Sequence, residues 1–161
     1  MVSKSGIGFK LHKMTSLKNV FLVEDDIDDQ LFFTEALSEI KHAVLLDIAY
    51  DGQEALEKLE KIFFLPDLIF MDINMPGMNG IQCLEEIVKK PVLKEIPIII
   101  ISTSTQQVAI AQSLGAKAFI KKPNNVEILR NRLEEIINLD FNKPSCYHMR
   151  AFIYGTHSTQ N

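Results

Sequence analysis

The sequence predicts an α/β protein, a doubly wound (βα)5 fold with a five-stranded parallel sheet. Two observations support this class: short apolar runs recur five times along the 161 residues, and the segments between them have the spacing of amphipathic helices. Strands buried on both faces of a sheet are apolar throughout, whereas half-exposed strands alternate. We therefore expect parallel strands that are covered on both sides and joined by right-handed helical crossovers.

Each expected strand coincides with one apolar run. The runs cover residues 20–23, 44–49, 68–71, 98–101 and 118–120. Each expected helix follows a stripe of apolar residues at helical spacing. The stripes cover residues 32–40, 56–63, 81–88, 108–114 and 126–137. Asp51-Gly52 should turn the chain into the second helix, Gly115 should end the fourth, and "MPGMNG" at 75–80 should form a loop.

The composition fits one globular domain and argues against several classes of function. The chain is 47% hydrophobic, and its net charge of −4 gives no basic excess, so we expect no direct contact with nucleic acid. Cys83 and Cys146 form no CxxC motif, which argues against a zinc site and fits a reducing cytoplasm. No apolar run is long enough to cross a bilayer. We expect a cytoplasmic protein with no membrane contact.

Polar side chains follow four of the expected strands. They are Glu24, Asp25, Asp26, Asp72, Ser102, Thr103, Lys121 and Lys122. Ligands of a doubly wound sheet gather beyond these carboxyl ends. Converging carboxylates repel one another unless a cation lies among them, and hard oxygen ligands suit Mg²⁺. A metal beside a carboxylate, opposite a lysine and a hydroxyl, fits phosphoryl transfer, in which an aspartate can accept the group covalently.

Four motifs resemble those of one known family. They are "FLVEDD", "DLIFMDINMPGMNG", "IPIIIISTS" and "AFIKKP", in this order. Residues 19–137 are similar to the receiver domain of two-component response regulators, and most similar to its stand-alone, single-domain type. The resemblance implies a flavodoxin-like fold with strand order 2-1-3-4-5. Residues 1–18 would be a flexible leader, and residues 138–161 a C-terminal extension too short for an output domain.

The resemblance implies a phosphoacceptor and a metal site. Asp72 would accept the phosphoryl group. Asp25 would bind Mg²⁺ or Mn²⁺ directly, Glu24 would reach it through water, and Asp72 and the backbone carbonyl of Asn74 would complete the protein ligands.

The resemblance also implies a switch beside the acceptor. Ser102 would donate its hydroxyl to one phosphoryl oxygen, and Lys122 would pair with another. Phe119 would turn inward as Ser102 moves toward the phosphoryl group. The bond between Lys122 and Pro123 would be cis, as is usual in the family.

The implied function is that of a phosphorelay protein. It would take a phosphoryl group from a histidine kinase or a histidine phosphotransfer protein and signal by contact with a downstream protein target, with homodimerisation possible. It would not be an enzyme beyond its own phosphorylation and dephosphorylation. Two alternatives stay open: an interaction module that does not use the chemistry, and a metal-dependent phosphohydrolase. The phosphohydrolase family has a second aspartate two residues after the nucleophile, where this chain has Asn74.

The remaining acids and the two ends allow simpler explanations. Asp28 and Asp29 should stabilise the start of the first helix, while Asp26 could be its N-cap or lie beside the metal. Met14 could be the natural start. The extension at 138–161 is unusually apolar, so docking onto the domain or a partner is an alternative to disorder.

Overall fold

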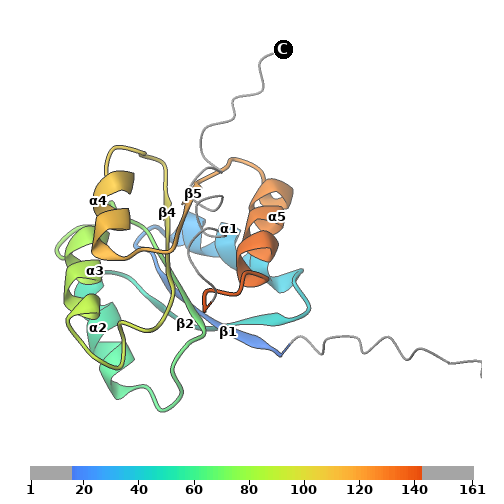
Figure 1. Ribbon diagram of the computed structural model, residues 1–161. Helices are drawn as coiled ribbons and strands as arrows, with labels where there is room; N and C mark the ends of the chain where they lie inside the picture. The colour runs from blue at the N-terminus through green and yellow to red at the C-terminus, as the bar shows by residue number, and fades with distance from the viewer. Residues whose placement is uncertain (1–15, 143–161) are drawn as a thin grey trace, which may run out of the picture.

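The computed structural model describes residues 16–142, which form a five-stranded parallel sheet between two layers of helices (Figure 1). The strands are β1 (Lys18–Val23), β2 (Ala43–Ala49), β3 (Leu68–Met71), β4 (Ile98–Ser102) and β5 (Ala118–Lys121). The helices are α1 (Ile27–Ser38), α2 (Gly52–Lys61), α3 (Gly80–Val88), α4 (Val108–Leu114) and α5 (Val126–Ile137). The strand order β2-β1-β3-β4-β5 confirms the prediction.

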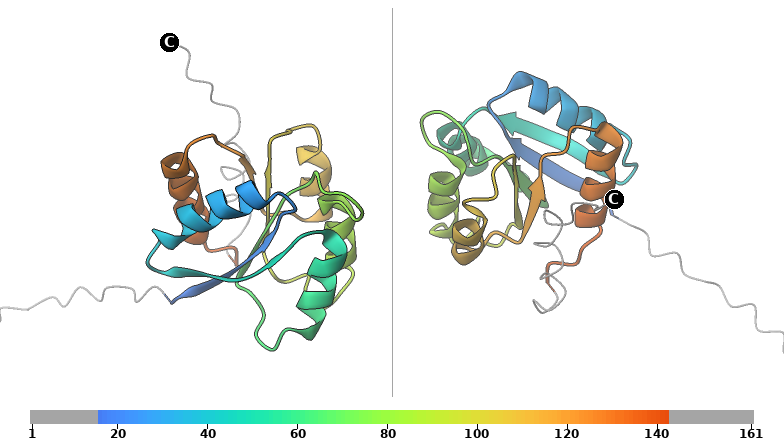
Figure 2. Two further views of the ribbon diagram at one scale, coloured as in Figure 1. Left: turned by 180° about the vertical axis from the view of Figure 1, so that it is seen from behind. Right: turned by 90° about the horizontal axis from the view of Figure 1, so that it is seen from above.

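The helices divide between the two faces of the sheet, with α1 and α5 on one and α2, α3 and α4 on the other (Figure 2). Successive residues of a strand point to opposite faces. Accordingly, Val20 and Leu22 of β1 join the core beneath α1 and α5, while Phe21 and Val23 join the core beneath the other three helices. Both cores demand apolar residues, which explains why β1 is apolar at four consecutive positions.

The predicted helix signals act as caps. The side chain of Asp51 accepts from the N–H of Glu54 at the start of α2, and Asn79 and Gln82 form a capping box at the start of α3. Gly115 follows α4 with φ of 110°, a left-handed conformation that favours glycine. These residues fix where α2 and α3 begin and where α4 ends.

The prediction that every strand is buried on both faces is wrong for β2. This strand lies at the edge of the sheet, where Val44 and Leu46 are exposed. Its pairing with β1 shifts register between Val20 and Phe21. At Ile48, the backbone N–H donates to the Asp47 carboxylate and the backbone C=O accepts from the Lys58 ammonium group. An edge strand has one neighbour and needs less apolar surface, so its apolar run overstates its burial.

The predicted second helical stripe, residues 56–63, extends beyond the end of the observed helix. Helix α2 ends at Lys61, Ile62 has extended backbone angles, and Phe63 is 90% exposed. The apolar spacing continues beyond the point where the chain turns back to begin β3.

The expected cis bond is also absent, because residues 16–142 contain no cis peptide bond and Lys122–Pro123 is therefore trans. Trans is the lower-energy isomer even before proline. Within the same residues, no helix is long and apolar enough to span a membrane. The expectations for Met14, the leader before residue 16 and the extension after residue 142 fall outside the described residues.

Candidate functional site

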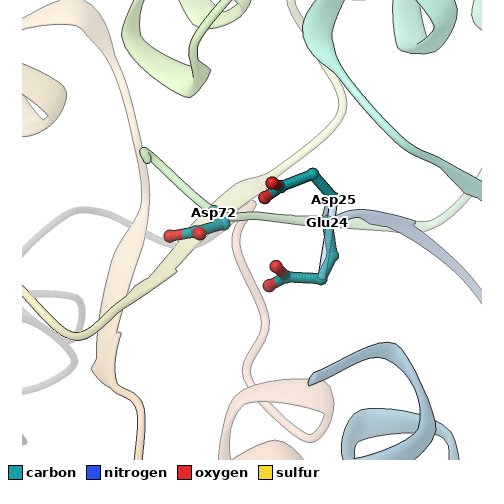
Figure 3. Close-up of side chains that lie close together, drawn as sticks. All are labelled: Glu24, Asp25 and Asp72. Carbon is teal, nitrogen blue, oxygen red and sulfur yellow. The ribbon is translucent and has the colours of Figure 1, made fainter. Parts of the chain in front are cut away.

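Three acidic side chains meet beyond the carboxyl ends of β1 and β3 (Figure 3). Glu24 and Asp25 follow β1, and Asp72 follows β3. One carboxylate oxygen of each residue lies within 4.8 Å of the others. The backbone fixes this meeting, because the Asp72 N–H donates to the Val23 carbonyl at 2.9 Å. Three converging carboxylates are a donor set that suits Mg²⁺, so the predicted metal residues fit the ion.

The two oxygens of Asp72 have different partners. The Oδ1 atom accepts from the N–H of Ile73 at 2.7 Å, whereas Oδ2 faces the Lys122 Nζ atom at 3.2 Å. Behind the residue, the N–H of Gly80 donates to the Ile73 carbonyl, and a Cβ at Gly80 would lie 2.1 Å from the Asp72 carbonyl oxygen. The start of α3 therefore packs directly against the backbone of Asp72, and only glycine fits there.

Lys122, one residue beyond β5, binds three carboxylates. Its Nζ atom lies 2.6 Å from Glu24 Oε2 and 2.6 Å from Asp29 Oδ2, in addition to the contact with Asp72. The contact with Asp29 was missed by sequence reasoning, which expected that residue only to favour the helix dipole. An acid in the first turn of α1 is visible in the sequence, but its direction relative to β5 depends on tertiary packing.

Burial and ion pairing change the acidity of this cluster. Burial raises the pKa of Glu24 to about 7, although the hydrogen bond from Lys122 opposes the rise. Burial alone would lower the pKa of Lys122, but its hydrogen bonds to Asp29 and Glu24 outweigh that effect and raise it. Lys122 is therefore charged at neutral pH, whereas Glu24 is only partly ionised there.

Ser102, the last residue of β4, brings a hydroxyl to the same edge. The residue is fully buried, and its Oγ atom accepts from the Asn74 side-chain amide at 3.3 Å and from the Ser104 N–H at 3.4 Å. Asn74 lies in the loop after β3. The orientation of its backbone carbonyl toward a metal stays a prediction.

The arrangement of acids, lysine and hydroxyl agrees with the comparison to known families. Residues 20–134 match the response regulator receiver domain. The chain belongs to this family. Phosphorylation and binding of Mg²⁺ are typical of such receiver domains, which act in two-component systems.

A curated relative and two solved structures illustrate the similarity. The relative is a protein-glutamate methylesterase/protein-glutamine glutaminase of Trichodesmium erythraeum (strain IMS101), 32% identical over 121 residues, which are 73% of this chain and 33% of the relative. The chain thus spans about a third of the length of this relative.

The phosphorylated cyanobacterial phytochrome response regulator RcpA is 31% identical with a TM-score of 0.67, covering 75% of this chain and 91% of that one. One chain of the CheX-CheY-BeF3-Mg+2 complex from Borrelia burgdorferi is 30% identical with a TM-score of 0.66, covering 76% of this chain and 90% of that one.

Two further residues of the receiver domain have definite positions. Phe119 of β5 is buried in the core beneath α2, α3 and α4, so its ring lies inward. Asp26 is the N-cap of α1, because its side chain accepts from the N–H groups of Asp28 and Asp29. Between the two roles left open for Asp26, the structure favours the cap.

Proposed function

We propose that this receiver domain is a phosphoryl acceptor of a phosphorelay, with Asp72 as the acceptor and a histidine kinase or histidine phosphotransfer protein as the donor. One observation carries the proposal: the carboxylate of Asp72 lies among the acids Glu24 and Asp25 and the charged Lys122 at one edge of the sheet. This is the set of charges that a transferring phosphoryl group requires.

The three carboxylates present fit a Mg²⁺ or Mn²⁺ ion, which would bind Asp25, Asp72 and the carbonyl of Asn74 directly and Glu24 through water. When bound, the ion neutralises charge on the transferring group. An oxygen of Asp72 attacks the phosphorus of the donor phosphohistidine. A P–O bond forms as the P–N bond breaks, and its electron pair stays on the imidazole nitrogen.

Lys122 and Ser102 act on the oxygens of the transferring group. The ammonium group of Lys122 is already within 3.2 Å of Asp72, so it can pair with a phosphoryl oxygen attached there. The hydroxyl of Ser102 accepts two hydrogen bonds and has its own proton to donate. Phe119 already lies inward, so movement of Ser102 is the step of the switch that remains.

The proposed output is contact with a downstream protein target in the cytoplasm, without turnover of a substrate by this chain. The match with RcpA supports a single-domain regulator, since it covers 91% of that chain. The methylesterase relative is about three times longer than the matched part, so its activity is no part of this proposal.

The test is the mass of the intact protein after incubation with Mg²⁺ and acetyl phosphate. Wild type should gain one labile phosphoryl group, and Asp72→Asn should gain none. Asp28→Asn is the matched control, because Asp28 is an exposed acid on the first turn of α1. No gain in wild type, or an undiminished gain in Asp72→Asn, would contradict the proposal. An unphosphorylated wild type would favour the interaction module, and sustained release of phosphate from small esters would favour the phosphohydrolase.

A further inference from the structure

The ammonium group of Lys122 has one acidic partner more than the proposed reaction explains. Its three protons face three carboxylates, those of Glu24, Asp29 and Asp72. We propose that Asp29 is a positioning residue that holds Lys122 outward from Asp72, where a phosphoryl oxygen will be placed. This inference rests on the proposed function of Asp72.

The distances show where the ammonium group is held. The Nζ atom is 2.6 Å from both Glu24 and Asp29, but 3.2 Å from Asp72. The side chain of Asp29 is 45% exposed, whereas that of Asp72 is 7% exposed. Asp29 therefore lies on the solvent side of Lys122 and Asp72 on the buried side. The contact with Asp29 is shorter than the contact with Asp72 and equal in length to the contact with the buried Glu24.

This position matters because Asp72 has one oxygen with few partners. Its Oδ1 atom already accepts from the N–H of Ile73, so Oδ2 is the oxygen better placed to attack a donor. A closer ammonium group would occupy Oδ2 and reduce its nucleophilicity. By sharing Lys122, Asp29 leaves Oδ2 with a longer contact and keeps the charge available for the phosphoryl oxygens.

Asp29 is itself held firmly enough to act in this way. Its N–H donates to the Asp26 cap at 3.1 Å. One residue further along α1, the side chain of Gln30 is buried and donates to the Glu24 carbonyl at 2.6 Å. The first turn of α1 is thereby fixed to the end of β1, and the Asp29 carboxylate keeps its place relative to the acids.

The experiment compares Asp29→Asn with Asp28→Asn under saturating Mg²⁺. Both variants remove one charge from the same helix turn, but the Asp28 side chain has no hydrogen bond or ion pair to another of residues 16–142 in the structure. The rate of Asp72 phosphorylation is measured against acetyl phosphate concentration. We expect Asp29→Asn to lower the saturated rate constant about three- to tenfold, as fits one partly exposed charged contact, and to leave the half-saturating concentration unchanged. Asp28→Asn should match wild type.

A second measurement does not depend on phosphorylation. Exchange of the Lys122 ammonium protons with water, followed by NMR, should be faster in Asp29→Asn than in Asp28→Asn. The inference would be overturned by equal phosphorylation rate constants in the two variants, by faster phosphorylation of Asp29→Asn, or by equal exchange rates of the Lys122 protons. Failure of the proposed function would look different, because wild type itself would then gain no phosphoryl group.

Discussion

The side-chain amide of Asn74 donates a hydrogen bond to the Oγ atom of Ser102 over 3.3 Å. This contact joins the loop after β3 to the end of β4. A second donor, the N–H of Ser104, points at the same oxygen. With two donors on the oxygen, the hydroxyl proton must point elsewhere, so it can be offered to a phosphoryl group without breaking either contact.

Loss of this hydroxyl should slow phosphorylation. In Ser102→Ala, the rate constant for labelling of Asp72 by acetyl phosphate should fall roughly ten- to hundredfold, since a hydrogen bond to a charged group contributes about 1.5–3 kcal/mol. Ser113→Ala is the control, because Ser113 is exposed on α4 and its hydroxyl donates to the Ile110 carbonyl. An unchanged rate in Ser102→Ala would remove Ser102 from the site.

Binding of Mg²⁺ should depend on pH through Glu24. Burial raises the pKa of this residue from its usual 4.5 to about 7, so the folded protein holds its proton more tightly than the unfolded chain does. The contribution of Glu24 to stability is therefore present below pH 4.5 and lost as the pH rises through about 7. Mg²⁺ needs the ionised carboxylate, so its apparent affinity should rise between about pH 6 and pH 8.

Thermal unfolding in a series of Mg²⁺ concentrations at each pH measures both effects. Glu24→Gln should weaken the pH dependence, whereas Glu57→Gln, an exposed change on α2, should keep it. An affinity in wild type that stays constant over this range would refute the role of Glu24 in metal binding.

A side chain at position 80 should disrupt the site from behind. The added Cβ of Gly80→Ala would meet backbone atoms of Asp72 and Ile73 at 2.1–2.9 Å, so the strand end or α3 must move. We expect a loss of more than about 3 kcal/mol of unfolding free energy, measured with denaturant.

Gly77→Ala is the comparison, since a Cβ there meets no atom within 4 Å and only its φ of 69° is unfavourable. Its cost should be about 1–2 kcal/mol. Equal losses would argue against the close packing.

The end of α2 can be tested by stability. Phe63→Ser should change the unfolding free energy by no more than about 0.5 kcal/mol, because the side chain is 90% exposed. Leu59→Ala, one turn earlier and buried, should cost about 2–5 kcal/mol. A large loss of unfolding free energy in Phe63→Ser, measured with denaturant, would instead place Phe63 in the core, as its apolar spacing predicted.

The fold was predictable because local and global signals agree. Four of the five predicted apolar runs are buried at every position, and caps such as Asp51 and Gly115 mark the helix ends they were expected to mark. The positions of Glu24, Asp25, Asp72, Ser102 and Lys122 followed from one rule, that parallel strands end at a common edge. Their proposed chemical roles stay predictions until phosphorylation is measured.

The features that the sequence did not reveal depend on the direction of a side chain or on the segments packed around a residue. Nothing in the spacing of acids distinguishes Asp29, which contacts Lys122, from Asp28, which is exposed. The apolar run of β2 resembles that of a central strand because edge position is a property of the assembled sheet. The trans bond at Lys122–Pro123 likewise depends on a small energy difference that the surroundings decide.

The side chains around Ile48 also affect whether another protein chain can pair with the open edge of the sheet. An open sheet edge with outward valine and leucine residues is a template on which another chain can add a strand. Here Asp47 and Lys58 already occupy the N–H and C=O of Ile48, the two groups that an added strand would need. A strand added at this position would have to displace both side chains and break the ion pair between them. These two side chains therefore hinder strand addition, and with it aggregation, at Ile48 of the edge strand β2.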